Sequence, residues 1–290
     1  MSAAVEKAIP GAAEKPGSLF THFARISGRS PSVLWELENR AADVGQNVAV
    51  TVAALYDIHG NLHALRAVLA DVEAAGADLI VIGGDVAAGP MPAATLDLLR
   101  SVGSRARFVR GNADRSMVEV FDGRKAHESD GWPAGQLTRA DRDFLAGFEL
   151  SYVLEVDGLG PTCFCHAVPT SDDVTVTAIT PEEVALEALA GTNAGLVVAG
   201  HTHMQFDRRM RERRMVNAGS VGMPYADRPG AYWALLGPEV SLRRTDYDFE
   251  AAAAAIRRTG FPDREAFARQ VVQPPTAEEA TAFFERRAGR

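Results

Sequence analysis

Residues 48–61 read VAVTVAALYDIHGN, and this stretch decides the fold of the 290-residue chain. Its first nine residues form an apolar run, interrupted only by Thr51, which is typical of a strand buried on both faces. Asp57 and His59 follow at once, and apolar residues then recur at helical spacing over residues 62–75. The stretch predicts a strand, a loop with metal-binding side-chain types, and a helix.

The same strand and helix pattern repeats further along the chain. Residues 79–82 and 107–110 are predicted strands with a helix over residues 95–102 between them, which indicates a parallel sheet with right-handed crossovers. After residue 150 many connections are tight and glycine-rich, which favours antiparallel pairing. The later strand candidates are residues 152–156, 162–166, 196–199, 205–210, 214–217, 231–236 and 240–245. We therefore expect an α/β fold with a second, more antiparallel half.

Three further regions surround this core. Residues 1–46 are rich in Ala, Gly, Pro and Ser and are expected to be an N-terminal extension, loosely ordered or with a short helix at residues 32–40. The domain itself is expected to span residues 47–246, with a polar, cap-like insert at about residues 115–148. Residues 247–290 are expected to form a helical tail, which either covers the core or mediates self-association into a homo-oligomer.

Composition and charge narrow the function classes. With 30 Lys+Arg against 38 Asp+Glu the formal charge is −8, which disfavours broad nucleic-acid binding. The longest apolar run is nine residues, whereas a bilayer span needs ~20, so no membrane partner is expected. No apolar segment follows a basic N-terminus, so a secretory signal is not expected. Cys163 and Cys165 are too close in sequence for a structural disulfide, which is typical of a reducing cytoplasm.

Polar side chains follow the predicted strands at the edge where ligands bind in α/β sheets. Asp57 and His59, expected in an extended segment, would point to the same side. Asp85 and Asn112 follow the next two strands, and each comes after a glycine. The other candidates are His166, His201 and His203, each at or after a later strand. Each motif alone is weak evidence, but their concurrence indicates a site for Zn, Mn, Fe, Ni or Co rather than Ca.

Five motifs carry a family resemblance. They are Asp57-Ile58-His59-Gly60-Asn61, Gly83-Gly84-Asp85, Gly111-Asn112-Ala113-Asp114, His166, and Gly200-His201-Thr202-His203. The chain resembles the calcineurin-like metallophosphoesterase superfamily, and NAGSVG at residues 217–222 is similar to an element of its small bacterial and archaeal phosphodiesterase branch. The resemblance implies a two-sheet mixed β-sandwich flanked by helices, with four layers in the order α/β/β/α.

The resemblance also implies a dinuclear metal site. One ion would be held by Asp57, His59 and His203. The other would be held by Asn112, His166 and His201, with Asp85 as the bridging ligand. The same seven residues form the expected catalytic set. Manganese is the first expectation for both ions, with iron, zinc, nickel or cobalt as alternatives.

The implied activity is phosphate-ester hydrolysis, and a phosphodiesterase with a metal-bridging hydroxide as nucleophile is the first expectation. The substrate would be a small phosphate ester, with a nucleotide as one candidate. Asn61, at the start of the first helix, and Arg115, in the insert, are the expected substrate-binding residues. Trp132 in the insert would either stack on a base or pack on the surface.

Two departures from the family pattern matter. Many members have histidine where this chain has Ala113, and alanine cannot protonate a leaving group, which favours diesters with good leaving groups. Tyr56 stands where a small hydroxyl residue is more usual, and its ring would lie either near the metals or in the core. The alternatives are a phosphomonoesterase or protein phosphatase on the same site, a nuclease, and a non-catalytic metal-binding scaffold. Ala113 weighs against the first, the acidic charge against the second, and the intact ligand set against the third.

Overall fold

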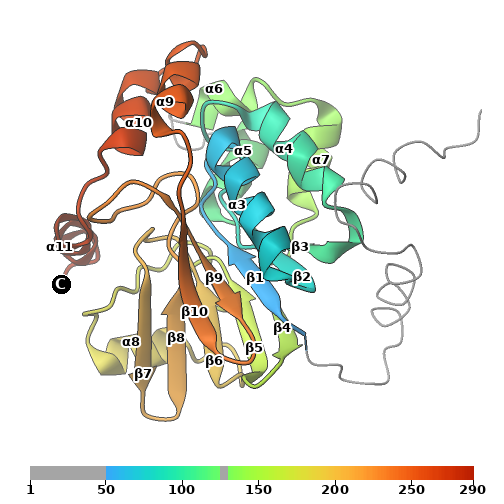
Figure 1. Cartoon of the computed structure of the whole chain (residues 1–290). Helices are drawn as coiled ribbons and strands as arrows, with labels where there is room; N and C mark the ends of the chain where they lie inside the picture. Colours follow the sequence, from blue (N-terminus) through green and yellow to red (C-terminus); the bar gives the residue numbers. More distant parts are fainter. Residues whose placement is uncertain (1–49, 125–129) are drawn as a thin grey trace, which may run out of the picture. The chain divides into compact units, whose positions relative to one another are not determined.

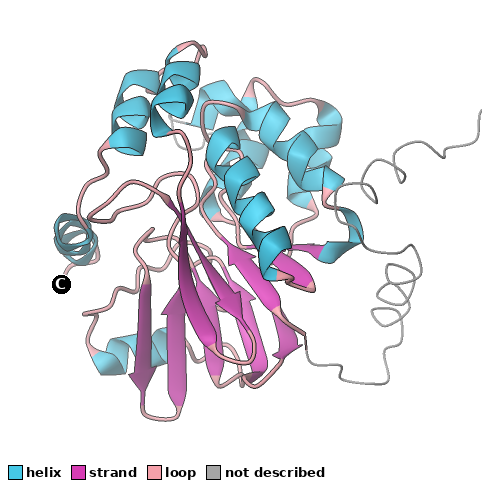
Figure 2. Ribbon diagram, in the orientation of Figure 1, coloured by secondary structure: helices cyan, strands magenta, loops and turns pink. Residues whose placement is uncertain are grey.

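The computed structural model describes residues 50–124 and 130–290, in which two five-stranded sheets pack between helices (Figures 1 and 2). The helix expected at residues 32–40 and the first two residues of the apolar run lie outside this part. No helix of the described ranges combines the length and the apolar character that a bilayer crossing requires.

The first sheet has the order β10-β9-β1-β2-β3. Its strands are β1 (Val52–Leu55), β2 (Leu79–Ile82), β3 (Ala106–Phe108), β9 (Ala231–Leu236) and β10 (Val240–Thr245). Strands β1, β2 and β3 run parallel to one another, as predicted. Strand β9 pairs antiparallel with β1, and β10 pairs antiparallel with β9. Helices α3 (Leu62–Ala75) and α4 (Pro92–Ser101) make the connections, and the 3-10 turn Gly103–Arg105 leads into β3.

The second sheet has the order β4-β5-β6-β8-β7. Its strands are β4 (Ser151–Val156), β5 (Gly160–Cys165), β6 (Leu196–Ala199), β7 (Phe206–Met210) and β8 (Arg213–Asn217). The β4–β5 and β7–β8 pairs are antiparallel, but β5, β6 and β8 run parallel to one another. The second half is therefore more antiparallel than the first, as expected, although the centre of this sheet is parallel. A long connection through α8 (Glu182–Ala188) lets the chain return in the same direction.

The apolar side chains form three layers of core. Ala53 and Leu55 of β1 face the helices, whereas Val52, Ala54 and Tyr56 face the second sheet, because side chains alternate along a strand. A third cluster lies between the second sheet and α8 and contains the free cysteines Cys163 and Cys165. This arrangement confirms the predicted α/β/β/α sandwich, and the alternation explains why β1 is apolar throughout.

The segment expected to be a polar cap is largely helical. It forms α5 (Asn112–Phe121), α6 (Gly131–Ala134) and α7 (Arg139–Ala146), while residues 125–129 lie outside the described part. Met117, Leu145 and Phe148 belong to the same buried cluster as β1 and α3. The segment is thus built into the helical layer, and its influence on substrate choice stays a prediction.

The C-terminal residues form α9 (Phe249–Arg257), α10 (Arg264–Val272) and α11 (Ala277–Arg287). The first two lie against each other with an apolar cluster of their own, which includes Ile256, Phe261 and Phe267. Figure 1 shows all three, in orange and red, at the ends of the strands where the predicted ligands lie.

Candidate dinuclear metal centre

The loops that follow β1, β2 and β6 share an uncommon backbone conformation. Asp57, His59, Asp85, His201 and His203 have left-handed φ angles of 53°, 46°, 52°, 65° and 60°. Among the other described non-glycine residues, only Arg211 has such an angle. The expectation that Asp57 and His59 lie in an extended segment is therefore wrong. Bonds between loops stabilise the strained turns, such as Asp57 N to Gly84 O (3.1 Å) and His59 N to Asp85 O (2.8 Å).

Two glycines allow these loops to approach each other closely. Gly84 has a φ of 98°, and a Cβ there would lie 2.5 Å from the Gly111 nitrogen. A Cβ on Gly111 would lie 2.1 Å from Oδ1 of Asp85. Any side chain at either position would push Asp85 and Asn112 apart, which explains why glycine is present at both positions of the motifs.

Two groups of donor side chains share Asp57, and in each group the ligand atoms lie within 4.8 Å of one another. One consists of Asp57, His59 and His203, and the other of Asp57, Asp85 and His166. Oδ1 of Asp57 lies 3.3 Å from Nε2 of His203 and 3.8 Å from Nε2 of His166. Oδ2 of Asp85 lies 3.4 Å from Nε2 of His166 and 3.7 Å from Nε2 of His59, between the two groups.

The donor set fits a cation. Oδ1 of Asp57 is buried and accepts no hydrogen bond in the described structure, although an unpaired buried carboxylate oxygen is costly. Three histidines are fixed through Nδ1, which leaves Nε2 for the site. The Nδ1 contacts are His59 to Ala88 O (3.2 Å), His166 to Gly83 O (2.9 Å) and His203 to Met223 O (2.7 Å). A metal ion would satisfy the orphaned oxygen and the converging imidazoles together.

Asn112 and His201 complete the cluster. The amide group of Asn112 lies 3.2 Å from Nε2 of His166 and 3.1 Å from Nδ1 of His201. The backbone N–H of His201 donates to Oδ2 of Asp57 at 2.9 Å. The structure thus brings all seven predicted residues together, and it places Asp57 in both donor groups, whereas the sequence analysis gave it to one.

The cluster is strongly polarised. Burial works against a charged ring at His166, but the carboxylates of Asp85 and Asp57 raise its pKa to about 10. Burial and the neighbouring His166 lower the pKa of His201 to about 4. Burial also works against the charge of Asp57, but His203 and His166 lower the pKa of that carboxyl. Protons on imidazoles therefore balance the carboxylates when no cation is bound, and a divalent cation would replace them.

Asp114 is a functional residue that the sequence analysis did not assign. It is fully buried, and its two oxygens accept hydrogen bonds from the backbone N–H groups of Asp85 (2.8 Å), Val86 (2.9 Å) and Gly111 (3.0 Å). Burial, and then the Asp85 charge, raise its pKa to about 7. Asp114 clamps the loops that carry Asp85 and Asn112, and its place in the Gly111–Asp114 motif was the available signal.

The position of Tyr56 is settled by the core. Its ring is fully buried between the sheets, and its hydroxyl donates to Val198 O at 2.9 Å. The ring packs against Gly83 and Gly200, where Cβ atoms would come within 1.9 Å and 2.6 Å of it. Tyr56 therefore spaces the two sheets beneath the site and faces away from the metal ligands.

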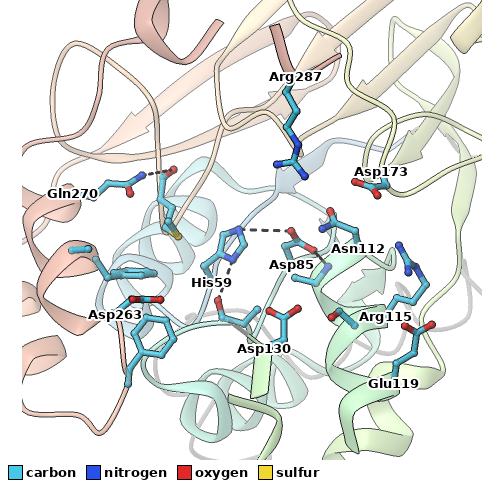
Figure 3. Close-up of a pocket in the computed structure, with 17 residues that line it drawn as sticks. His59, Asp85, Asn112, Arg115, Glu119, Asp130, Asp173, Asp263, Gln270 and Arg287 are labelled. Carbon is cyan, nitrogen blue, oxygen red and sulfur yellow. Dashed lines mark hydrogen bonds and ion pairs between the residues drawn. The ribbon is translucent and has the colours of Figure 1, made fainter. Parts of the chain in front are cut away.

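A cavity of about 590 Å³ opens beside the cluster, and Figure 3 shows its lining. Arg115 lines it and makes two hydrogen bonds of 3.0 Å to Asp172. Asn61 is not among the lining residues, because it is fully buried, caps α3 through Ala64 N (3.2 Å) and donates to Gly222 O (3.1 Å). The predicted contact of Asn61 with substrate stays a prediction. Trp132 packs against Phe261 with 5.8 Å between the ring centroids.

Solved structures resemble the described fold over most of the chain. A metallophosphoesterase from Sphaerobacter thermophilus is 24% identical, covers 77% of this chain and 98% of its own, and has a TM-score of 0.63. A hypothetical protein from Pyrococcus horikoshii OT3 is 18% identical, covers 79% of this chain and 100% of its own, and has a TM-score of 0.68. These similarities show the fold.

Sequence comparison adds a family and a distant relative. A segment of 84 residues is 37% identical to a symmetrical bis(5'-nucleosyl)-tetraphosphatase of Janthinobacterium sp. (strain Marseille). That match covers 28% of this chain and 31% of the relative, so it spans about a third of the curated protein. Residues 50–237, more than half of the chain, match the calcineurin-like phosphoesterase superfamily domain. The chain therefore belongs to the calcineurin-like phosphoesterase superfamily.

Proposed function

We propose that the chain is a dinuclear-metal phosphodiesterase for small diesters with good leaving groups. The observation that carries the proposal is the convergence of seven donor side chains beside a cavity that three of them line together with Ala113. A methyl group at that point exchanges no proton. The distant relative's name supports nucleotide esters as the first substrates to test.

In the proposed site Asp57, His59 and His203 would hold one divalent ion and Asn112, His166 and His201 the other, with Asp85 between them and Asp57 close to both donor groups. When bound, the two ions supply a water-derived nucleophile at neutral pH and stabilise charge on the phosphoryl oxygens. Manganese is the first ion to test.

The chain's own contribution is preorganisation. The left-handed turns and the carbonyl-bound Nδ1 atoms hold the ligand side chains in place before any substrate arrives, so little reorganisation is needed during the reaction. The hydrogen bond to Asp172 raises the already high pKa of the Arg115 guanidinium and fixes its position. From the rim of the cavity Arg115 binds a non-bridging phosphate oxygen.

The absence of a donor at Ala113 gives the proposal its test. We would measure kcat for aryl methyl phosphate diesters whose leaving phenols span a range of pKa values. A steep fall in kcat with increasing phenol pKa is expected, because the leaving oxygen departs unprotonated. The Ala113→His variant should flatten this dependence. Preference for an unactivated alkyl phosphate monoester over every diester would overturn the proposal.

A further inference from the structure

The C-terminal helices supply a second wall of the cavity, although they lie beyond the segment that matches the family. We call Phe261, Phe267, Gln270 and Arg287 the helical wall, and the seven candidate ligands the ligand wall. His59, Asp85 and Asn112 line the same cavity from the ligand wall. Figure 3 shows Arg287 projecting into the space toward Asp85 and Asn112, with Gln270 to one side.

A buried latch fixes α11 in place. Glu285, which is 7% exposed, accepts hydrogen bonds of 2.6 Å from the hydroxyls of both Thr177 and Thr180. Arg290 donates to its other oxygen at 2.7 Å. Oppositely charged and hydroxyl partners thus hold the last turn of α11 to the loop that precedes α8.

A ring contact fixes which way α11 faces. The ring of Phe284 lies 6.4 Å from that of His201 and 6.1 Å from that of Tyr225, which in turn stacks on His203 at 5.2 Å. Residues three apart share a helix face, so Arg287 lies on the side of Phe284 and of the ligand wall.

Arg287 is set apart from the other basic groups nearby. Within the described part of the chain it forms no hydrogen bond or ion pair, whereas Arg115 is bonded to Asp172 and Arg290 to Glu285. Four carboxylates also line the cavity, and none is within ion-pair distance of Arg287. They are Glu119, Asp130, Asp173 and Asp263. They disfavour an anion elsewhere in the cavity, so a polyanionic ligand is accommodated at two points, the metal centre and Arg287.

We infer that Arg287 is a specificity-determining residue that binds a second phosphoryl group of the substrate. The guanidinium forms paired, charge-assisted hydrogen bonds with phosphate oxygens. The inference rests on the proposed function, because it places the scissile phosphate at the metal centre. The substrate class is then a phosphate ester that carries at least one further phosphate, such as a nucleoside or dinucleoside polyphosphate. Phe261 and Phe267 offer apolar surface to its organic part.

Binding tests the inference without turnover. Calorimetry on the manganese-loaded full chain would compare α,β-methylene-ADP, which has two phosphoryl groups, with AMP, which has one. Arg287→Ala should weaken binding of the diphosphate by about tenfold or more and leave AMP within about twofold. Arg287→Lys should retain part of the difference. Arg286→Ala is the matched control, because it removes the same charge from the neighbouring exposed position, which does not line the cavity.

Kinetics separate this inference from the proposed function. Arg287→Ala should lower kcat/KM for diadenosine tetraphosphate, mainly through KM, and leave bis(p-nitrophenyl) phosphate nearly unchanged. Equal losses on both substrates, or an unchanged ratio of diphosphate to AMP affinity, would overturn the role of Arg287. Failure of the wild type to hydrolyse bis(p-nitrophenyl) phosphate would instead overturn the proposed function, and the binding ratio would still decide the role of Arg287.

Discussion

The two walls of the cavity are stabilised by different means. The ligand wall is held by backbone groups: three of its four histidines are bonded to main-chain carbonyls, and five of its seven residues are in left-handed turns. The helical wall is held by side chains, through the Glu285 latch and the packing of Phe284 and Phe267. The first design gives fixed geometry for chemistry. The second places Arg287, the proposed substrate contact, on a helix separate from the loops that carry the candidate metal ligands.

The largest effect should come from Asp57, because both donor groups share its Oδ1. Asp57→Asn should lower kcat on bis(p-nitrophenyl) phosphate by at least ~1,000-fold, since metal-ion catalysis contributes several kcal/mol. The melting temperature of the wild type should rise when manganese is added, and that rise should be much smaller in the variant. Asp97→Asn, at an exposed position on α4, is the control. Retention of both ions and of activity in Asp57→Asn would contradict the assignment of the metal centre to the ligand wall.

This difference between the walls also explains what the sequence could predict. The ligand wall is encoded in short motifs, because a ligand after a strand and the glycine before it are neighbours in the chain. The left-handed turns at Asp57 and His59 were missed, since no local signal separates such a turn from an extended loop. The latch joins Glu285 to Thr177, 108 positions away, and neither residue type announces the contact. The role of α11 therefore emerged only from the fold.

Gly83→Ala tests whether the loops of the ligand wall depend on the close packing of the Tyr56 ring beneath them. A Cβ at this position would lie 1.9 Å from the ring of Tyr56, which is held between the two sheets. The variant should lose about 3 kcal/mol of unfolding free energy, measured by denaturant titration, because overpacking at a rigid site forces the backbone to move. Gly195→Ala is the matched control, since its Cβ would meet nothing within 4 Å. Equal stability of the two variants would contradict the spacer role of Tyr56.

Glu285→Gln tests the latch of the helical wall. Burial works against its charge, but Arg290 and the two threonines lower the pKa of Glu285 from 4.5 to about 2. A pKa that is lower in the folded state stabilises the protein above pH 4.5, and this stabilisation is lost as the pH falls toward 2. Near neutral pH the variant should be roughly 1–3 kcal/mol less stable than the wild type.

Thermal unfolding from pH 7 downward would measure the latch, because the gap between wild type and Glu285→Gln should close as the solution becomes acidic. Glu278→Gln, at an exposed position on the same helix, should follow the wild type at every pH. A gap that is constant with pH would show that the carboxylate charge of Glu285 does not hold α11. Faster amide exchange confined to α11 in Glu285→Gln would locate the effect.

The smallest effect is expected at Arg211, which has a left-handed φ angle like the ligand-wall residues but is not a candidate metal ligand. It lies at the tip of the β7–β8 hairpin with a φ of 47°, its side chain is 60% exposed, and it pairs with Glu182 and Glu183. Arg211→Gly relieves about 1 kcal/mol of strain and loses a surface pair of similar or smaller value. Stability should therefore change by less than about 1 kcal/mol, and diesterase activity should not change. Asp85→Gly relieves the same kind of strain but should abolish activity. A loss of activity in Arg211→Gly would show that a left-handed turn far from the ligand wall also affects activity. It would contradict the interpretation that such turns are concentrated at the ligand wall for catalysis.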